Sequence, residues 1–147
     1  MTRIVDVSSQ AVRVAVGRAR VARLAERVLR AEGVRHAMLS IAFVSDREIA
    51  ALNWRHLRHR GPTDVISFGF APARAGGPVV GDVYIAPGVA RRNAAAHRTG
   101  VREEILRLVI HGVLHVLGHE HPTDDLRMHS PMWQRQERLL RLALAAA

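Results

Sequence analysis

The stretch HGVLHVLGHEH, residues 111–121, carries three histidines in the pattern H-x-x-x-H-x-x-G-x-x-H. On a helix, side chains four residues apart project from one face with Cβ atoms about 5–6 Å apart, so His111 and His115 can bind one ion together. We expect Gly118 to end that helix, because glycine adopts the left-handed conformation at little cost. The chain would then turn back and deliver His121 as a third nitrogen ligand. Three neutral imidazoles around an open fourth position are what a catalytic zinc ion requires.

The same spacing occurs in the metzincin proteases, but one position differs. Those enzymes carry a glutamate directly after the first histidine, where it acts as general base, and this chain has Gly112 there. The pattern therefore predicts the metal site of a peptidase without its base, which favours a different metal-assisted reaction. Of the other polar residues in the stretch, we expect His119 to point away from the ion. Glu120 could orient a ligand or could be a solvated loop residue.

The chain has 147 residues, which is the size of one domain. It has no apolar segment of the ~18 residues that a membrane-spanning helix needs. Residues 1–6 lack the apolar core of an export signal, so we expect a cytoplasmic protein that does not contact a membrane. Cysteine is absent, so nitrogen and oxygen atoms must hold the metal.

The charge of the chain is strongly positive. Its 22 basic residues outnumber its 13 acidic residues, and every basic residue is arginine, giving a formal net charge of +9. Such a chain is attracted to polyanions, and nucleic acid is the first candidate. A GC-rich genome would explain the absence of lysine, but it does not explain the excess of basic over acidic side chains.

Hydrophobic periodicity predicts strands that alternate with helices and are followed by two helices in a row. Ser45 opens a capping box with Glu48, and Ser130 precedes a proline as a second expected N-cap. The predicted strands cover residues 3–7, 37–44, 64–68 and 81–85, and the predicted helices cover residues 10–32, 46–57, 87–98, the stretch between Gly100 and Gly118, and the residues from Pro131 onward. This order favours an α+β fold: a single domain over residues 1–147, in which a four-stranded mixed sheet is packed with about five helices.

The basic loop RHRGPT, residues 58–63, connects a predicted helix to a predicted strand. It could be a solvated connection or a contact for phosphate groups. Asp64 and Asp82 each lie at the start of a predicted strand, as its first and second residue respectively. A turn or cap hydrogen bond is the favoured interpretation for both, and the alternative is a proton carrier or a partner that fixes the tautomer of a histidine ligand.

Four blocks of the sequence resemble the YbeY family of bacterial rRNA-maturation endoribonucleases, in the family's order. The block at residues 111–121 is similar to the family's H-G-x-L-H-L-x-G-x-D-H, and PTDVISF at residues 62–68 is similar to its P-T-D-V-L-S-F. Residues 52–53 and GDVYI at residues 81–85 resemble its L-N and G-D-I-x-I segments. The resemblance covers roughly residues 40–140 and implies a single α+β domain.

The resemblance also implies a function. It implies one zinc ion, held by His111, His115 and His121, in a single-strand-specific, metal-dependent endoribonuclease that acts in rRNA maturation, ribosome assembly and quality control. The implied partners are rRNA or other single-stranded RNA and the small ribosomal subunit.

One family residue has no direct counterpart. Members often carry an arginine five residues before the proline of P-T-D-V, where this chain has Leu57, with Arg58 and Arg60 nearby. Phosphodiester cleavage builds negative charge on the phosphoryl group, and a guanidinium is well suited to stabilise that charge. We therefore predict Arg58 as the first candidate for a catalytic and substrate-binding residue, and Arg60 as the second candidate for substrate binding. Glu120 stands where the family usually has aspartate. Glutamate keeps the negative charge, but its extra methylene group moves the carboxylate.

Two routes of cleavage stay open, because either a water activated by zinc or the 2′-hydroxyl of the RNA could attack the phosphodiester. Two other functions also fit the sequence. One is a non-catalytic rRNA-binding assembly factor with a structural zinc, and the other is a metallohydrolase acting on peptide or ester bonds. Gly112 disfavours the peptidase, and the open fourth position favours catalysis.

Overall fold

The computed structural model describes residues 2–70, 72, 74–121 and 128–146. Four strands form one sheet in the order β1-β2-β4-β3. β1, β2 and β4 are parallel to one another, and β3 pairs antiparallel with β4. The strands are β1 (Thr2–Ser9), β2 (His36–Phe43), β3 (Val65–Phe70) and β4 (Val79–Ile85). The predicted four-stranded mixed sheet is therefore confirmed.

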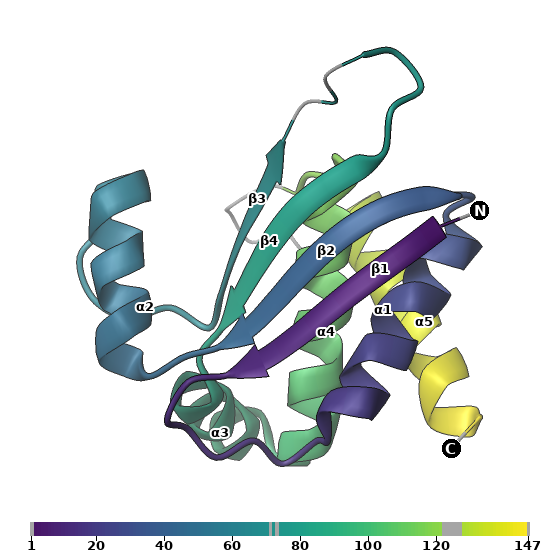
Figure 1. The fold of residues 1–147 in the computed structure, drawn as a ribbon. Helices are drawn as coiled ribbons and strands as arrows, with labels where there is room; N and C mark the ends of the chain where they lie inside the picture. Colours follow the sequence, from purple (N-terminus) through teal and green to yellow (C-terminus); the bar gives the residue numbers. More distant parts are fainter. Residues whose placement is uncertain (1, 71, 73, 122–127, 147) are drawn as a thin grey trace.

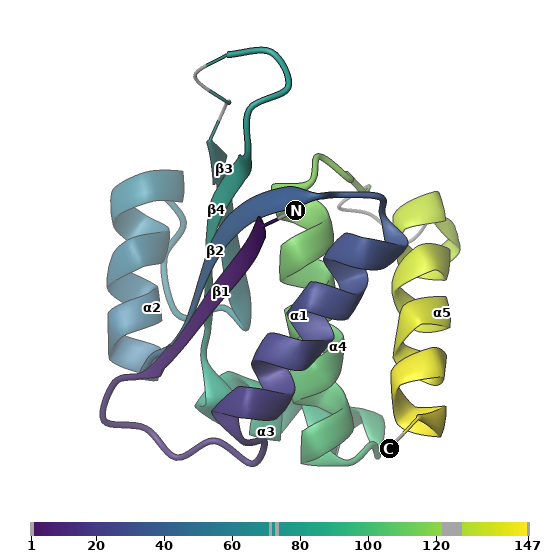
Figure 2. The same cartoon turned by 45° about the vertical axis from the view of Figure 1, so that its right-hand side comes forward.

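Helices cover both faces of this sheet (Figure 1). Figure 2 shows α1, α4 and α5 on one side of the sheet and α2 on the opposite side, and α4 packs against both α1 and α5. The helices are α1 (Arg18–Ala31), α2 (Asp46–Leu52), α3 (Pro87–His97), α4 (Val101–Val116) and α5 (Pro131–Ala145), and a π-helical turn η1 (Asn53–Leu57) follows α2 directly. Five α-helices in the described residues confirm the predicted fold class. None of them combines the length and apolar character that a membrane crossing requires.

Two hydrophobic cores hold the layers together. The larger core lies between the sheet and the layer of α1, α4 and α5, and it includes Ile41 and Val83 from the strands and Val109 from α4. The smaller core lies under α2, where Ile49 packs with Ile66 of β3. Because successive strand residues point to opposite faces, neighbouring positions of β3 and β4 serve different cores.

Hydroxyl caps begin two of the helices as the sequence predicts. Ser45 Oγ accepts a hydrogen bond from the backbone N–H of Glu48 at 3.1 Å, which opens α2. Ser130 Oγ accepts one from the backbone N–H of Trp133 at 3.2 Å, which opens α5. At the end of α4, Gly118 has φ +97°, the left-handed conformation expected of it.

The predicted helix over residues 10–32 is wrong at its start, because α1 begins only at Arg18. Residues 10–17 instead form an irregular crossing from β1. Val12 and Val14 pack against the larger core and Val16 is buried in it, so the valines alternate with a period of two residues. Gly17 is extended (φ −67°, ψ 150°) and serves as the N-cap. Alternating valines and a glycine disfavour a helix in this segment.

Candidate metal centre

Helix α4 and the turn after it bring the three predicted ligands together. One ring nitrogen each from His111, His115 and His121 lies within 4.8 Å of the other two. The ring centroids are 4.7 Å apart for His111 and His115, 5.1 Å for His111 and His121, and 5.0 Å for His115 and His121. His111 is buried, and the other two side chains are half-buried. We call these residues the three-histidine cluster.

A buried glutamine on α5 orients His111. His111 Nδ1 and Gln136 Oε1 lie 2.6 Å apart. The amide nitrogen of Gln136 donates to a carboxylate oxygen of Glu137 at 3.0 Å, and because a carboxylate only accepts, this contact leaves Oε1 facing His111. Nδ1 of His111 must then carry the proton and donate it. Nε2 of His111 is therefore the atom left to bind an ion.

An ion-pair network holds this glutamine in place. Glu137 receives two hydrogen bonds from Arg107 of α4, from Nε at 2.9 Å and from Nη2 at 3.1 Å. Burial would raise the pKa of Glu137, but hydrogen bonds from Arg107 and Gln136 and the positive charge of Arg107 lower that pKa overall. Arg107 also pairs with Glu103 at 3.4 Å and with Glu104 at 3.3 Å. The network ties α5 to α4 beside the cluster.

The other polar residues of the stretch lie outside the cluster. His119 Nε2 is 2.6 Å from Glu32 Oε1 at the end of α1, and Glu32 also accepts a hydrogen bond from Arg135 Nε at 2.8 Å. His119 therefore points away from the cluster, as the sequence analysis expected, and joins the turn to α1 and α5. Glu120 is exposed.

Gly112 lies where α4 crosses the sheet most closely. A Cβ atom at this position would lie 2.5 Å from Val83 Cγ1 and 3.2 Å from Ser67 Oγ. A Cβ atom at Gly81 of β4 would collide with the side chain of Val116. These two glycines let the C-terminal half of α4 approach β3 and β4. The position of the metzincin base thus faces the sheet here and has no room for a side chain.

The structure places both candidate arginines on one aromatic ring in the segment after α2. The guanidinium carbon of Arg58 lies 5.5 Å from the Trp54 ring centroid, and that of Arg60 lies 5.0 Å from it. Trp54 is 45% exposed, and so is Leu57. Arg58 ends η1 in the left-handed conformation, with φ +56°. We call Trp54, Arg58 and Arg60 the tryptophan platform.

The two strand aspartates lie apart from the cluster. Asp64 Oδ2 accepts a hydrogen bond from Asn93 of α3 at 3.2 Å, and this supports its interpretation as a turn residue. On β4, Val83 points toward α4, so Asp82 beside it points to the opposite face of the sheet. Burial is the main cause of the raised pKa of Tyr84, and the charge of Asp82 contributes to it.

Gln136 is the site residue that the sequence analysis missed. A signal for it exists, because Gln136 follows Met132 by four residues and precedes Leu140 by four, on the apolar stripe of α5. It is only 1% exposed. A polar residue at a core position of an amphipathic helix needs a partner, and here the partner is His111.

The fold and the cluster define the class of this protein: a single α+β domain with a candidate metal centre of three histidines at the end of a helix. The model of the family Endoribonuclease YbeY matches residues 6–143 of the chain. Endoribonuclease YbeY of Thermobifida fusca is 39% identical over 129 residues, which are 82% of this chain and 82% of that protein. Endoribonuclease YbeY of Syntrophus aciditrophicus is 30% identical over 142 residues, which are 95% of this chain and 89% of that protein. The chain belongs to the Endoribonuclease YbeY family, as its resemblance to that family predicted.

A solved structure shares the fold. The solution structure of TM1509 from Thermotoga maritima superposes with a TM-score of 0.63 at 23% sequence identity, covering 97% of this chain and 91% of that chain. The likeness supports the layered arrangement of sheet and helices on which the cluster is built.

Proposed function

We propose that this chain is a zinc-dependent endoribonuclease that cleaves single-stranded RNA during rRNA maturation. The observation that carries the proposal is the convergence of one nitrogen each from His111, His115 and His121. Membership of the Endoribonuclease YbeY family supports the reaction class. Ligation by imidazole alone favours zinc among the divalent metals. The proposal treats residues 1–147 as one metallohydrolase domain, working in the cytoplasm on the RNA of the small ribosomal subunit.

The residues present fit such an ion. Zinc sites of catalytic type use three protein ligands with nitrogen donors and keep a fourth position for water or substrate. Gln136 accepts the Nδ1–H of His111, which leaves Nε2 of that ring as the atom that would bind zinc. A zinc ion held there supplies Lewis-acid chemistry for phosphodiester hydrolysis. The chain's own contribution is to orient the imidazoles and to bind the RNA backbone.

The tryptophan platform supports RNA as the substrate. Single-stranded nucleic acid binds where exposed aromatic rings stack on bases and cationic groups contact the backbone. Trp54 is exposed, and the guanidinium groups of Arg58 and Arg60 lie at its ring. We assign Arg58, and secondarily Arg60, to neutralising phosphate charge on the bound strand. Arg58 is the candidate for stabilising the charge that builds on the phosphoryl group.

Gly112 argues against peptide hydrolysis. The metzincin reaction needs a glutamate at this position, and here a Cβ atom would lie only 2.5 Å from Val83. The tight contact of α4 with the sheet therefore excludes a base of that kind in this fold.

The test is RNA cleavage by purified protein whose metal content is controlled. The protein is stripped with a chelator, reloaded with zinc, and incubated with single-stranded RNA. We expect cleavage to disappear on stripping and to return with zinc. Unchanged cleavage after complete removal of the metal would refute a metal-dependent step. Because a basic protein carries other ribonucleases through purification, a His111→Ala variant purified in parallel measures the background.

A further inference from the structure

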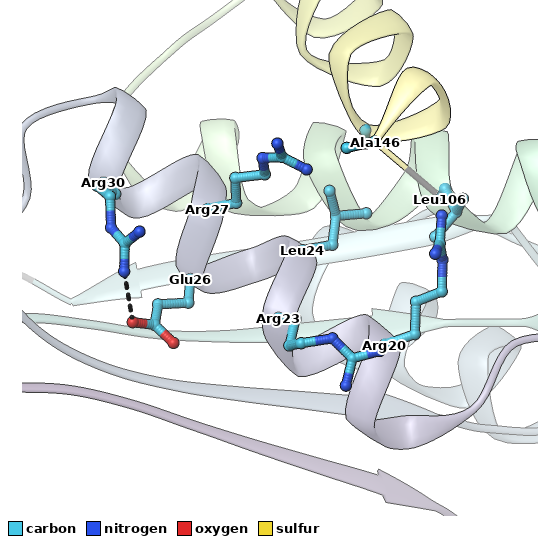
Figure 3. A pocket seen from close by; sticks show the side chains of 9 residues that line it. Arg20, Arg23, Leu24, Glu26, Arg27, Arg30, Leu106 and Ala146 are labelled. Carbon is cyan, nitrogen blue, oxygen red and sulfur yellow. Dashed lines mark hydrogen bonds and ion pairs between the residues drawn. The ribbon is translucent and has the colours of Figure 1, made fainter.

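An arginine-lined groove runs between α1 and α5 (Figure 3). Its volume is about 520 Å³, and it is lined mainly by side chains of α1. Four arginines of this helix form one wall, and apolar side chains including Leu24 and Leu106 form the floor. Figure 3 shows Arg27 extending toward Ala146, beyond the end of α5. The four arginines are Arg20, Arg23, Arg27 and Arg30, and we call this feature the arginine groove.

The positive charge of this groove is largely uncompensated. Glu26 is the single acidic residue in the lining, and it pairs with Arg30 at 3.3 Å and with Arg3 at 4.0 Å. Within the described part of the chain, no ion pair involves Arg20, Arg23 or Arg27. The Nε atom of Arg20 is buried and has no hydrogen-bond partner among those residues. A buried donor of this kind calls for an acceptor, and an anionic oxygen would supply one.

Helix stability alone does not explain the arginines. Their spacing of three and four residues places like charges next to one another, which disfavours the helix. The first turn of α1 contains no acidic residue, although a negative charge there would favour the helix dipole. Residues that disfavour the local structure are expected where they serve a purpose other than folding, and binding an anion is one that suits arginine.

The groove leads away from the three-histidine cluster. Glu32, just beyond the C-terminal end of α1, contacts His119 in the turn that carries the cluster. From Arg30 back to Arg20, α1 then extends for about 15 Å along the helix axis. The row of arginines therefore begins near the end of α1 that contacts the turn between His115 and His121.

We propose that the arginine groove binds the phosphodiester backbone of the RNA strand on one side of the cleavage site. The inference rests on the proposed function, because it assigns a second contact to the same substrate. Arginine is well suited to phosphate, since its planar fork donates two hydrogen bonds to one group. The groove would hold the phosphates that flank the scissile bond, and the apolar floor would leave room for a ribose or base.

The experiment compares two double variants that lose the same charge. Arg23→Gln with Arg27→Gln changes the groove at two exposed positions, and Arg47→Gln with Arg91→Gln changes two exposed arginines on α2 and α3. Each zinc-loaded protein is titrated with a fluorescent single-stranded 2′-O-methyl RNA, in which the 2′-hydroxyl cannot attack, over a range of salt concentrations. Gel electrophoresis after each titration checks that the RNA has stayed intact. We expect the groove variant to bind about ten-fold more weakly, with a log–log salt slope about 1.4 lower, and the control to change little. The Tm of the groove variant should equal or exceed that of the wild type, because two like charges have been removed from α1.

Equal losses in both double variants would show an effect of net charge alone and would overturn the groove assignment, as would unchanged RNA affinity in the groove variant. Binding of the same proteins to anionic lipid vesicles is measured in parallel. If the groove variant binds RNA like the wild type but no longer binds the vesicles, the groove belongs to a membrane-contacting surface instead. The proposed function fails separately, if the wild-type protein binds RNA through the groove but zinc does not restore cleavage of ordinary RNA.

Discussion

Gln136 Oε1 accepts a hydrogen bond from His111 Nδ1 at 2.6 Å, across a separation of 25 residues in the chain. This contact joins α5 to the side of α4 that carries His111. It makes Nδ1 of one ring in the three-histidine cluster the donor, and so leaves Nε2 as the atom available to an ion. Pre-orientation of this kind raises the affinity of a site, because less freedom is lost on binding.

We predict that Gln136→Leu weakens zinc binding about 10- to 100-fold, the usual effect of removing a partner of a ligating histidine. Leucine has a similar volume and no acceptor, so the ring of His111 loses its orientation. Zinc affinity measured by competition with a chromophoric chelator checks this. Gln134→Leu, an exposed position on the same helix, is the control. Equal zinc affinities in Gln136→Leu and wild-type protein would remove Gln136 from the account.

Arg58→Ala should weaken RNA binding and lower its log–log salt slope by about 0.7, the contribution of one phosphate contact on a single strand. Arg98→Ala is a matched control, because Arg98 is exposed and has nearly the same left-handed backbone, with φ +55°. Both substitutions thus leave the same backbone strain in place. Anisotropy titrations at several salt concentrations give the slope. If the slope of Arg58→Ala equals that of the wild type, Arg58 makes no phosphate contact.

Gly112→Ala should destabilise the fold by about 1–3 kcal/mol, because the new methyl group overpacks the contact between α4 and β4. Its Cβ would lie 2.5 Å from Val83 Cγ1. Urea unfolding measures the loss. Val83→Ala removes the colliding methyl groups, so the double variant should lose less stability than the sum of the two single variants. Strict additivity would mean that the two side chains do not meet.

Acid should unfold the protein partly through Glu137. The pKa of this carboxyl is lower in the folded state than its ordinary value of 4.5, because the hydrogen bonds and charge of Arg107 outweigh burial. A depressed pKa adds stability above the unfolded pKa, and the gain disappears as the pH falls through the folded pKa. The free energy of unfolding should therefore fall with decreasing pH below about 4.5.

In Glu137→Gln this acid-induced loss should be smaller, although the variant is less stable at pH 7. Glu104 has the opposite sign, because burial raises its pKa against the charge of Arg107. Its contribution is present at low pH and is lost as the pH rises through its folded pKa. Urea denaturation at a series of pH values separates the contributions of Glu137 and Glu104 to the free energy of unfolding. Parallel curves for Glu137→Gln and wild type would mean that Glu137 does not contribute.

The order of elements and the convergence of the three histidines could be predicted from sequence because they rest on local chemistry. Serine caps, the helix-ending Gly118 and the spacing of His111 and His115 each act within a few residues of the chain. The start of α1 could not be found in this way. There, Val16 is buried and Val12 and Val14 are partly buried, so these valines follow the tertiary packing of an irregular segment rather than a helical period.

The contacts that hold the cluster and its turn in place could not be predicted from local sequence patterns, for a different reason. Gln136 lies 25 residues after His111, and Glu32 lies 87 residues before His119. Such pairings depend on how α1 and α5 pack against α4. The role of Gly112 is of the same kind, because its side-chain space is occupied by Val83 from β4.

Zinc content and RNA cleavage, compared between His115→Ala and His119→Ala, test whether the three-histidine cluster holds a catalytic ion. His115 belongs to the three-histidine cluster, whereas His119 lies on the same turn and contacts Glu32. We predict one zinc per wild-type chain, loss of both zinc and cleavage in folded His115→Ala, and retention of both in His119→Ala. Cleavage of single-stranded RNA at the wild-type rate by a zinc-free His115→Ala protein would contradict the account.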